Sequence, residues 1–76
     1  MTTKARKRYF VCLSNGGYRA SLEVRKIYVV LPDAAASTEG LLRVIDESGE
    51  DYLYPTSLFA EIALPSSAAR AFRAAS

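Results

Sequence analysis

The stretch that decides the fold is residues 41–54, which read LLRVIDESGEDYLY. Its first half is mostly aliphatic and its end is Tyr-Leu-Tyr, and both compositions favour β-strands. Between them lies Glu47-Ser48-Gly49-Glu50, a tight turn whose glycine can take the left-handed conformation. Residues 41–46 and 51–54 are therefore predicted to pair as a β-hairpin.

Similar strand patterns precede this hairpin. Residues 8–14 (RYFVCLS) and 26–31 (KIYVVL) are rich in aromatic and β-branched side chains, which predicts two strands. Asn15-Gly16-Gly17 favours a turn after the first of them. We expect residues 22–25 to be an irregular lead-in to the second, and residues 33–39 to be a short helical turn or a loop.

Three shorter elements follow the hairpin. Pro55-Thr56-Ser57 predicts a 3₁₀ turn, because proline fixes φ and the hydroxyls can satisfy free backbone groups. Residues 59–64 read as a last strand. Pro65 then opens a terminal helix, with Ser66 or Ser67 as its N-cap and Phe72 as the residue expected to dock it. Short strands with frequent turns predict a small barrel.

The residues from Gly49 to Ile62, GEDYLYPTSLFAEI, resemble the end of an SH3-like barrel. In that pattern a hairpin leads into an aromatic–aliphatic strand, a proline-initiated 3₁₀ turn and a short closing strand. The positions that carry the resemblance are Gly49, Tyr52, Leu53, Pro55, Leu58 and Phe59. Through LEVRKIYVVLPD and RVIDESGEDYLYP, the whole chain also resembles a group of short bacterial proteins of uncharacterised function.

The predicted fold class is mainly β: a small SH3-like barrel of about five strands with a 3₁₀ turn and a short C-terminal helix. The barrel domain is expected to span residues 8–76 behind a flexible basic arm at residues 1–7. Peptide-binding SH3 domains use an aromatic groove that contains tryptophan, whereas this chain has no tryptophan and carries Leu58 where the groove needs tyrosine. Recognition of proline-rich peptides by that groove is therefore not expected.

Catalytic and metal chemistry find little support in the sequence. The chain has no histidine, so histidine-assisted nucleophiles are excluded, and its single cysteine cannot build a tetrahedral zinc site. Cys12 lies between Val11 and Leu13 in a predicted strand, which indicates a buried structural thiol. The chain is thus predicted not to be an enzyme and to need no cofactor or metal.

Four acids surround the predicted hairpin turn: Asp46, Glu47, Glu50 and Asp51. A tight hairpin points such groups into solvent, so we expect a solvated turn. An anionic contact patch is one alternative, and a metal site is another, although DESGED lacks the alternation of oxygen ligands usual for calcium.

The first eight residues hold four of the ten bases, Lys4, Arg6, Lys7 and Arg8, and none of the eight acids. The rest of the chain therefore carries a net negative charge. The basic arm could neutralise phosphates in a salt-dependent manner, which makes a nucleic-acid or ribosome-associated module the alternative function. A disordered, solubilising N-terminus is the simpler interpretation.

Several predicted strands are apolar on both faces, and a chain of 76 residues has little with which to cover the outer one. An uncovered apolar patch usually marks a contact surface. We therefore predict a small non-catalytic protein-binding or assembly module, whose partner is another protein or a second copy. Its expected contact residues are Tyr28, Ile45, Tyr52 and Tyr54, although the tyrosines could instead pack inside the barrel.

Two features bear on where the protein is found. No stretch approaches the about 20 apolar residues needed to cross a membrane, so no membrane association is expected. The single cysteine favours a reducing compartment, which predicts a cytoplasmic location.

Overall fold

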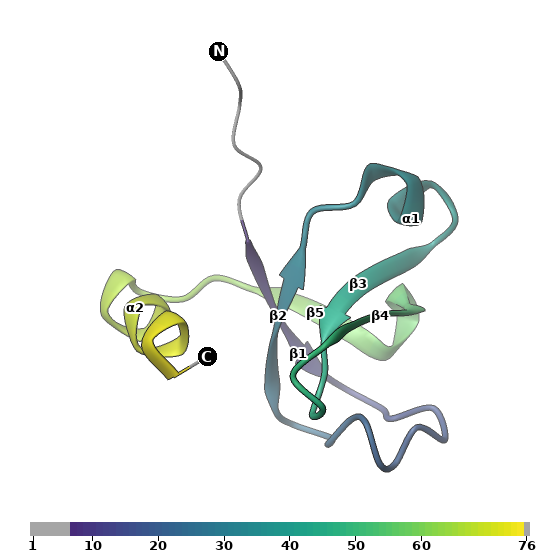
Figure 1. Ribbon diagram of the computed structural model, residues 1–76, viewed down its shortest axis with the longest axis horizontal. Coiled ribbons are helices and arrows are strands. Elements are labelled where there is room, and N and C mark those ends of the chain that lie inside the picture. The colour runs from purple at the N-terminus through teal and green to yellow at the C-terminus, as the bar shows by residue number, and fades with distance from the viewer. Residues whose placement is uncertain (1–6, 76) are drawn as a thin grey trace.

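The computed structural model describes the backbone of residues 7–75 and the side chains of residues 7–71 (Figure 1). Its elements are β1 (Arg8–Cys12), β2 (Ile27–Leu31), α1 (Ala34–Thr38), β3 (Leu41–Ile45), β4 (Asp51–Pro55), the 3₁₀ turn η1 (Thr56–Leu58), β5 (Phe59–Ile62) and α2 (Ser66–Ala75). The prediction of a mainly β chain is confirmed. Of the predicted basic arm, residues 1–6 lie outside the described part.

The five strands form one antiparallel sheet in the order β4-β3-β2-β1-β5. β1 lies between β2 and β5, and Phe10 is paired in register with Tyr28 of β2 and with Glu61 of β5. β3 and β4 form the predicted hairpin, in which Leu42 pairs with Tyr54. In the described part of the chain β4 and β5 are the two edges, so the sheet is not closed by strand pairing.

Alternate side chains of the strands point to one interior and form the core. Its buried members are Phe10, Cys12, Leu22, Tyr28, Val30, Leu42, Val44, Tyr54 and Phe59. All of them come from strands except Leu22, which belongs to the segment between β1 and β2. Cys12 is 0% exposed, as expected for a structural thiol.

The opposite face of the sheet is also largely apolar. The side chains that point outward from β1, β2 and β3 are half-buried, and they include Tyr9, Val11, Ile27, Val29, Leu31 and Ile45. The expectation that these strands are apolar on both faces therefore holds.

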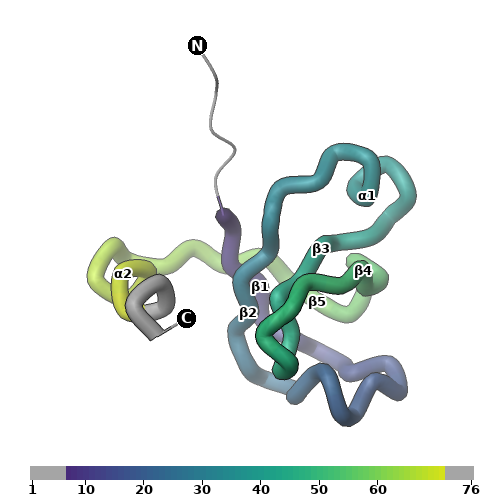
Figure 2. Tube along the Cα trace, in the orientation of Figure 1, coloured from purple at the N-terminus to yellow at the C-terminus, as the bar shows by residue number. Residues whose placement is uncertain are grey.

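Two α-helices accompany the sheet in the described part of the chain. α1 packs on β3, and its N-cap Asp33 accepts a 3.0 Å hydrogen bond from the amide of Ala36. Figure 2 shows the chain running from β5 to α2 away from β3 and β4. The predicted docking residue Phe72 lies outside the described side chains. Within residues 7–75, no helix combines the length and the apolar character that crossing a membrane requires.

Candidate functional site

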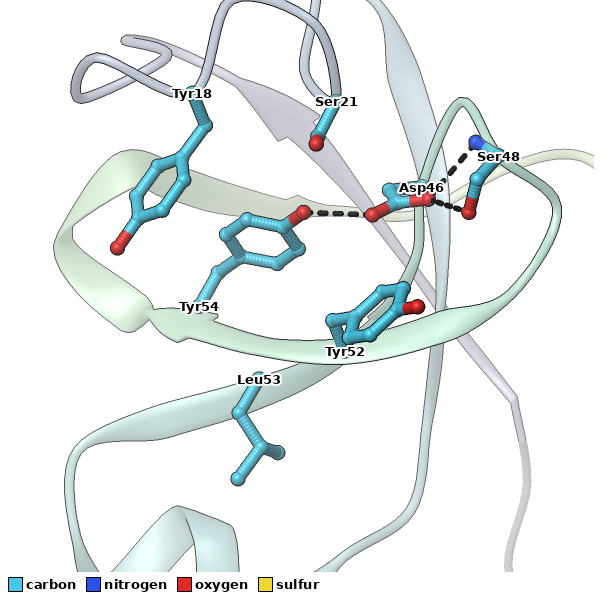
Figure 3. Close-up of a pocket in the computed structure, with 7 residues that line it drawn as sticks. All are labelled: Tyr18, Ser21, Asp46, Ser48, Tyr52, Leu53 and Tyr54. Carbon is cyan, nitrogen blue, oxygen red and sulfur yellow. Dashed lines mark hydrogen bonds between the residues drawn. The ribbon is translucent and has the colours of Figure 1, made fainter.

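A cleft of about 390 Å³ lies between the segment that connects β1 to β2 and the β3–β4 hairpin (Figure 3). Seven side chains line it: Tyr18, Ser21, Asp46, Ser48, Tyr52, Leu53 and Tyr54. The first two belong to the connecting segment, and the others to the hairpin and to β4. Its volume falls within the range of about 300–1,000 Å³ that is usual for ligand pockets.

Tyrosine rings form the walls of the cleft. The rings of Tyr18 and Tyr54 meet edge to face, with centroids 5.0 Å apart and an interplanar angle of 88°. Tyr54 is 4% exposed, whereas Tyr18 and Tyr52 are 45% and 51% exposed. The cleft therefore has a buried aromatic floor and two accessible aromatic walls, an arrangement suited to stacking and apolar contact.

Strand pairing explains why Tyr52 and Tyr54 differ so strongly in exposure. They point to the same side of β4, opposite Val44 and Leu42 of β3. Tyr54 is covered by Phe59 and Tyr18, whose ring centroids lie 6.5 and 5.0 Å from its own. Tyr52 lies two residues nearer the hairpin turn and is not a member of the buried core cluster.

Asp46 is the only charged residue in the lining and is 7% exposed. One of its oxygens, Oδ1, accepts hydrogen bonds from the Ser48 hydroxyl at 2.6 Å and the Ser48 amide at 2.9 Å. The other, Oδ2, accepts a 2.6 Å bond from the hydroxyl of Tyr54. Burial acts to raise the pKa of Asp46, and these hydrogen bonds outweigh it, so the pKa lies below its ordinary value. Asp46 is thus a carboxylate at neutral pH.

The prediction of a solvated acidic turn is wrong for Asp46, because its own turn and a core tyrosine enclose it. Glu47 is also engaged. It accepts a 2.5 Å bond from the hydroxyl of Tyr28 and forms a 2.7 Å ion pair with Lys26. Residues 47–51 are all exposed, so Asp46 is the one acid of the turn that is buried.

Glu47 also fastens the connecting segment that carries Tyr18 and Ser21. Its amide donates to the carbonyl of Ser21 at 3.0 Å, and the hydroxyl of Tyr28 accepts from the amide of Glu23 at 2.8 Å. Burial, followed by the bond to Glu47, raises the pKa of Tyr28, which therefore stays a neutral donor. These bonds hold the two walls of the cleft in a fixed relation.

The expected contact residues do not form one surface. Tyr28 and Tyr54 are 4% exposed core residues, which removes most of their rings from any contact surface. Ile45 is half-buried and lies on the outer face, opposite Asp51 of β4. Tyr52 is the one member of the expected set with an exposed ring.

Four lining residues were not predicted from the sequence as binding residues: Tyr18, Ser21, Ser48 and Leu53. Tyr18 follows Asn15-Gly16-Gly17 in an irregular segment, where strand alternation gives no guide to side-chain direction. An isolated aromatic residue directly after a glycine-rich turn was the available signal, because an exposed tyrosine at such a position often serves binding.

The expected nucleic-acid residues are only partly described. Lys4 and Arg6 lie outside the described residues, and Lys7 is exposed. Arg8 forms a two-pronged ion pair with Glu61, at 2.7 Å from Nε and 2.8 Å from an Nη atom, and its guanidinium lies 5.3 Å from the centre of the Phe10 ring. The charge of Arg8 is thus paired within the sheet. Nucleic-acid binding by the arm stays a prediction.

The described residues contain no group of three or more histidine, cysteine, aspartate or glutamate side chains placed to hold a metal ion. Burial raises the pKa of the Cys12 thiol, and Cys12 is not part of the cleft lining. What the cleft offers is aromatic faces, hydroxyl groups and one carboxylate, which are groups that bind by stacking and hydrogen bonding.

Comparisons of the chain with protein-family models, with curated proteins and with solved structures found no match.

Proposed function

We propose that this chain is a small SH3-like barrel that works as a non-catalytic protein-binding module, and that it contacts its partner through the cleft between Tyr18 and Tyr52. The observation that carries the proposal is the cleft itself. Two tyrosine rings, each about half exposed, face a cleft of about 390 Å³ whose floor is a buried tyrosine. Tyrosine is common in protein contacts because it joins an apolar ring to a wet hydroxyl.

The order of elements supports the SH3-like assignment. A long irregular connection follows β1, a tight hairpin joins β3 to β4, and one 3₁₀ turn separates β4 from β5. The two edge strands approach each other at this turn. The ring centroids of Tyr54 in β4 and Phe59 in β5 lie 6.5 Å apart. A sheet bent in this way encloses its core as a partly open barrel does.

The cleft differs from the groove by which SH3 domains hold proline-rich peptides. Leu58 of η1 packs against the core, where that groove needs a tyrosine. The binding surface proposed here is instead built from the β1–β2 connection and the β3–β4 hairpin. A cytoplasmic location remains a prediction from the single cysteine.

Site-specific photo-crosslinking tests the proposed function. A photoreactive amino acid at position 52 should give, in cells that express the chain, a cross-linked product of defined mass. The matched control carries it at Glu39, which is exposed and ends α1. The product should be absent from the control and should weaken at least fivefold with Tyr18→Ser. The same products from both positions would contradict the proposal, and light scattering of the purified chain shows whether the partner is a second copy.

A further inference from the structure

Two core tyrosines, Tyr28 and Tyr54, each donate a hydrogen bond to an acid of the hairpin, and one of these two pairs already holds a cation. The hydroxyl of Tyr28 donates to Glu47, and the ammonium of Lys26 lies 2.7 Å from Glu47 and 5.8 Å from the centre of the Tyr28 ring. Lys26 thus combines an ion pair with a cation–π contact, a geometry in which both attractions act on one charge.

The second pair, Tyr54 and Asp46, lines the cleft. Its hydrogen bond has the same form, from a core tyrosine to an acid of the hairpin. The donors to Asp46 are two hydroxyls and one amide, all neutral. Within residues 7–71, the acids paired with lysine or arginine are Asp33, Glu47, Asp51 and Glu61. The charge of Asp46 is therefore not balanced by a cation of the described chain.

Asp46 also keeps capacity for another donor. A carboxylate accepts about four hydrogen bonds, two at each oxygen. Oδ1 receives both bonds from Ser48, whereas Oδ2 receives only the bond from Tyr54. Asp46 lines the cleft, so a donor that enters the cleft can use this remaining capacity of Oδ2.

The field at the cleft is negative. No lysine or arginine is among the seven lining residues. The pKa of Tyr52 is raised by the charge of Glu50, by the hydrogen bond that the Tyr52 hydroxyl donates to Glu50, by desolvation, and by the charges of Asp46 and Asp51. The same field attracts a cation and repels a phosphate.

We infer that the cleft receives a basic side chain, lysine or arginine, presented by a segment of a partner protein, with its charge at Asp46 and its stem between the rings of Tyr18 and Tyr52. This inference rests on the proposed function and names the chemistry of the partner. The inference depends on complementarity between the cleft and a basic side chain. The carboxylate of Asp46, which has only neutral donors, matches the positive charge, and the two accessible aromatic faces match the apolar stem. A nucleic acid fits poorly, because its phosphates would meet the carboxylate of Asp46 in the cleft and that of Glu50 beside Tyr52.

NMR titration of the full chain with short peptides tests this directly. Four glycine–serine peptides differ only in their central residue, which is lysine, arginine, norleucine or glutamate. Lysine and arginine should give saturable shifts of the Tyr18 and Tyr52 ring signals, and norleucine, which keeps the stem without the charge, should bind at least tenfold more weakly. Equal binding of norleucine, or tighter binding of glutamate, would overturn the inference.

Variants of the cleft locate the effect. Asp46→Asn should weaken binding of the lysine peptide about tenfold. Since Asp46 is buried and this variant could lose stability, Tyr52→Ser provides a second test at an exposed position and should weaken binding at least threefold. Glu39→Gln, which removes a distant negative charge, should leave it unchanged. A loss as large with Glu39→Gln would show a general charge effect and would overturn the assignment to the cleft.

Two further titrations exclude other occupants. Replacing Lys4, Arg6 and Lys7 by glutamine should leave the peptide affinity unchanged; tighter binding after this replacement would show that the chain's own bases occupy the cleft. A short oligonucleotide should not shift the signals of Tyr18 and Tyr52, and such a shift would also overturn the inference.

If position 52 yields its specific cross-linked product but the peptides show no preference for a basic residue, the proposed function stands and the partner chemistry is wrong.

Discussion

The hydroxyl of Tyr54 donates a 2.6 Å hydrogen bond to the carboxylate of Asp46, eight residues earlier in the same hairpin. Both residues are buried, so the bond joins the charged start of the turn to the aromatic core. Ser48 satisfies the other oxygen of Asp46. The turn is therefore fixed at its base from inside the domain, and this also fixes the position of the cleft.

Tyr54→Phe should remove this bond and leave a buried carboxylate short of one donor. We expect a loss of about 1–3 kcal/mol in the free energy of unfolding, measured by urea denaturation. Tyr52→Phe is the matched control: its hydroxyl is exposed and lies 3.3 Å from Glu50, so it should change stability by less than about 0.5 kcal/mol. Equal losses in both variants would contradict a special role for the Tyr54–Asp46 bond.

Stability should fall in acid. Folding lowers the pKa of Asp46 and of Glu47 below their ordinary values of 3.8 and 4.5. Groups of this kind contribute stability that is complete above the unfolded value and is lost as the pH falls through the folded value. The urea midpoint should therefore be steady near neutrality and decline below about pH 4.5.

Glu47→Gln separates one group from the rest of this acid transition. The variant should be less stable than the parent at pH 7 and closer to it at pH 3. The decline should become shallower without disappearing, because Asp33 and Glu61 also have lowered pKa values. A parallel decline in parent and variant would show that Glu47 does not take part.

Leu22→Ala should be among the most destabilising substitutions in the chain, although Leu22 lies outside every strand and helix. Its side chain is fully buried in the core cluster, and truncating such a leucine costs about 2–5 kcal/mol. Leu13→Ala, at an exposed leucine of the same segment, should cost less than about 0.5 kcal/mol. Thermal unfolding followed by circular dichroism compares the two, and similar melting temperatures would contradict the burial of Leu22.

Tyr28→Phe should loosen the connection between β1 and β2. The hydroxyl of Tyr28 accepts from the amide of Glu23 and donates to Glu47, and the variant loses both bonds. Hydrogen exchange at the Glu23 amide should accelerate about tenfold, which corresponds to about 1.4 kcal/mol. Val30, a buried residue of β2, provides the internal comparison, and an equal acceleration there would indicate global rather than local opening.

The sequence predicts the strands of this chain well, and for an identifiable reason. Alternating apolar residues locate the β3–β4 hairpin and β2 to within about a residue, because that pattern requires one buried face. Strand ends are predicted less well. Leu13 and Ser14 fall outside β1, since their amides bond to the carbonyl of Leu58 at the 3₁₀ turn. That bond depends on the position of a distant segment.

The cleft is predicted only in part, because alternation does not say which of two apolar faces is the interior. Tyr28 and Tyr54 point inward and Ile45 outward, whereas the sequence names all three as expected contact residues and leaves open whether the tyrosines pack inside. Asp46 was expected in solvent, because its burial depends on a tyrosine hydroxyl on the neighbouring strand. Tyr18 lies in an irregular segment whose path is set by bonds to Glu47 and Tyr28.

The position of Cys12 has a practical consequence. It is the only cysteine of the chain, it is fully buried at the end of β1, and burial raises the pKa of its thiol. An alkylating reagent can therefore reach the sulfur only in molecules whose core has transiently opened. The modification rate of the unaltered protein measures the population of that open form, so the chain carries its own reporter of conformational opening.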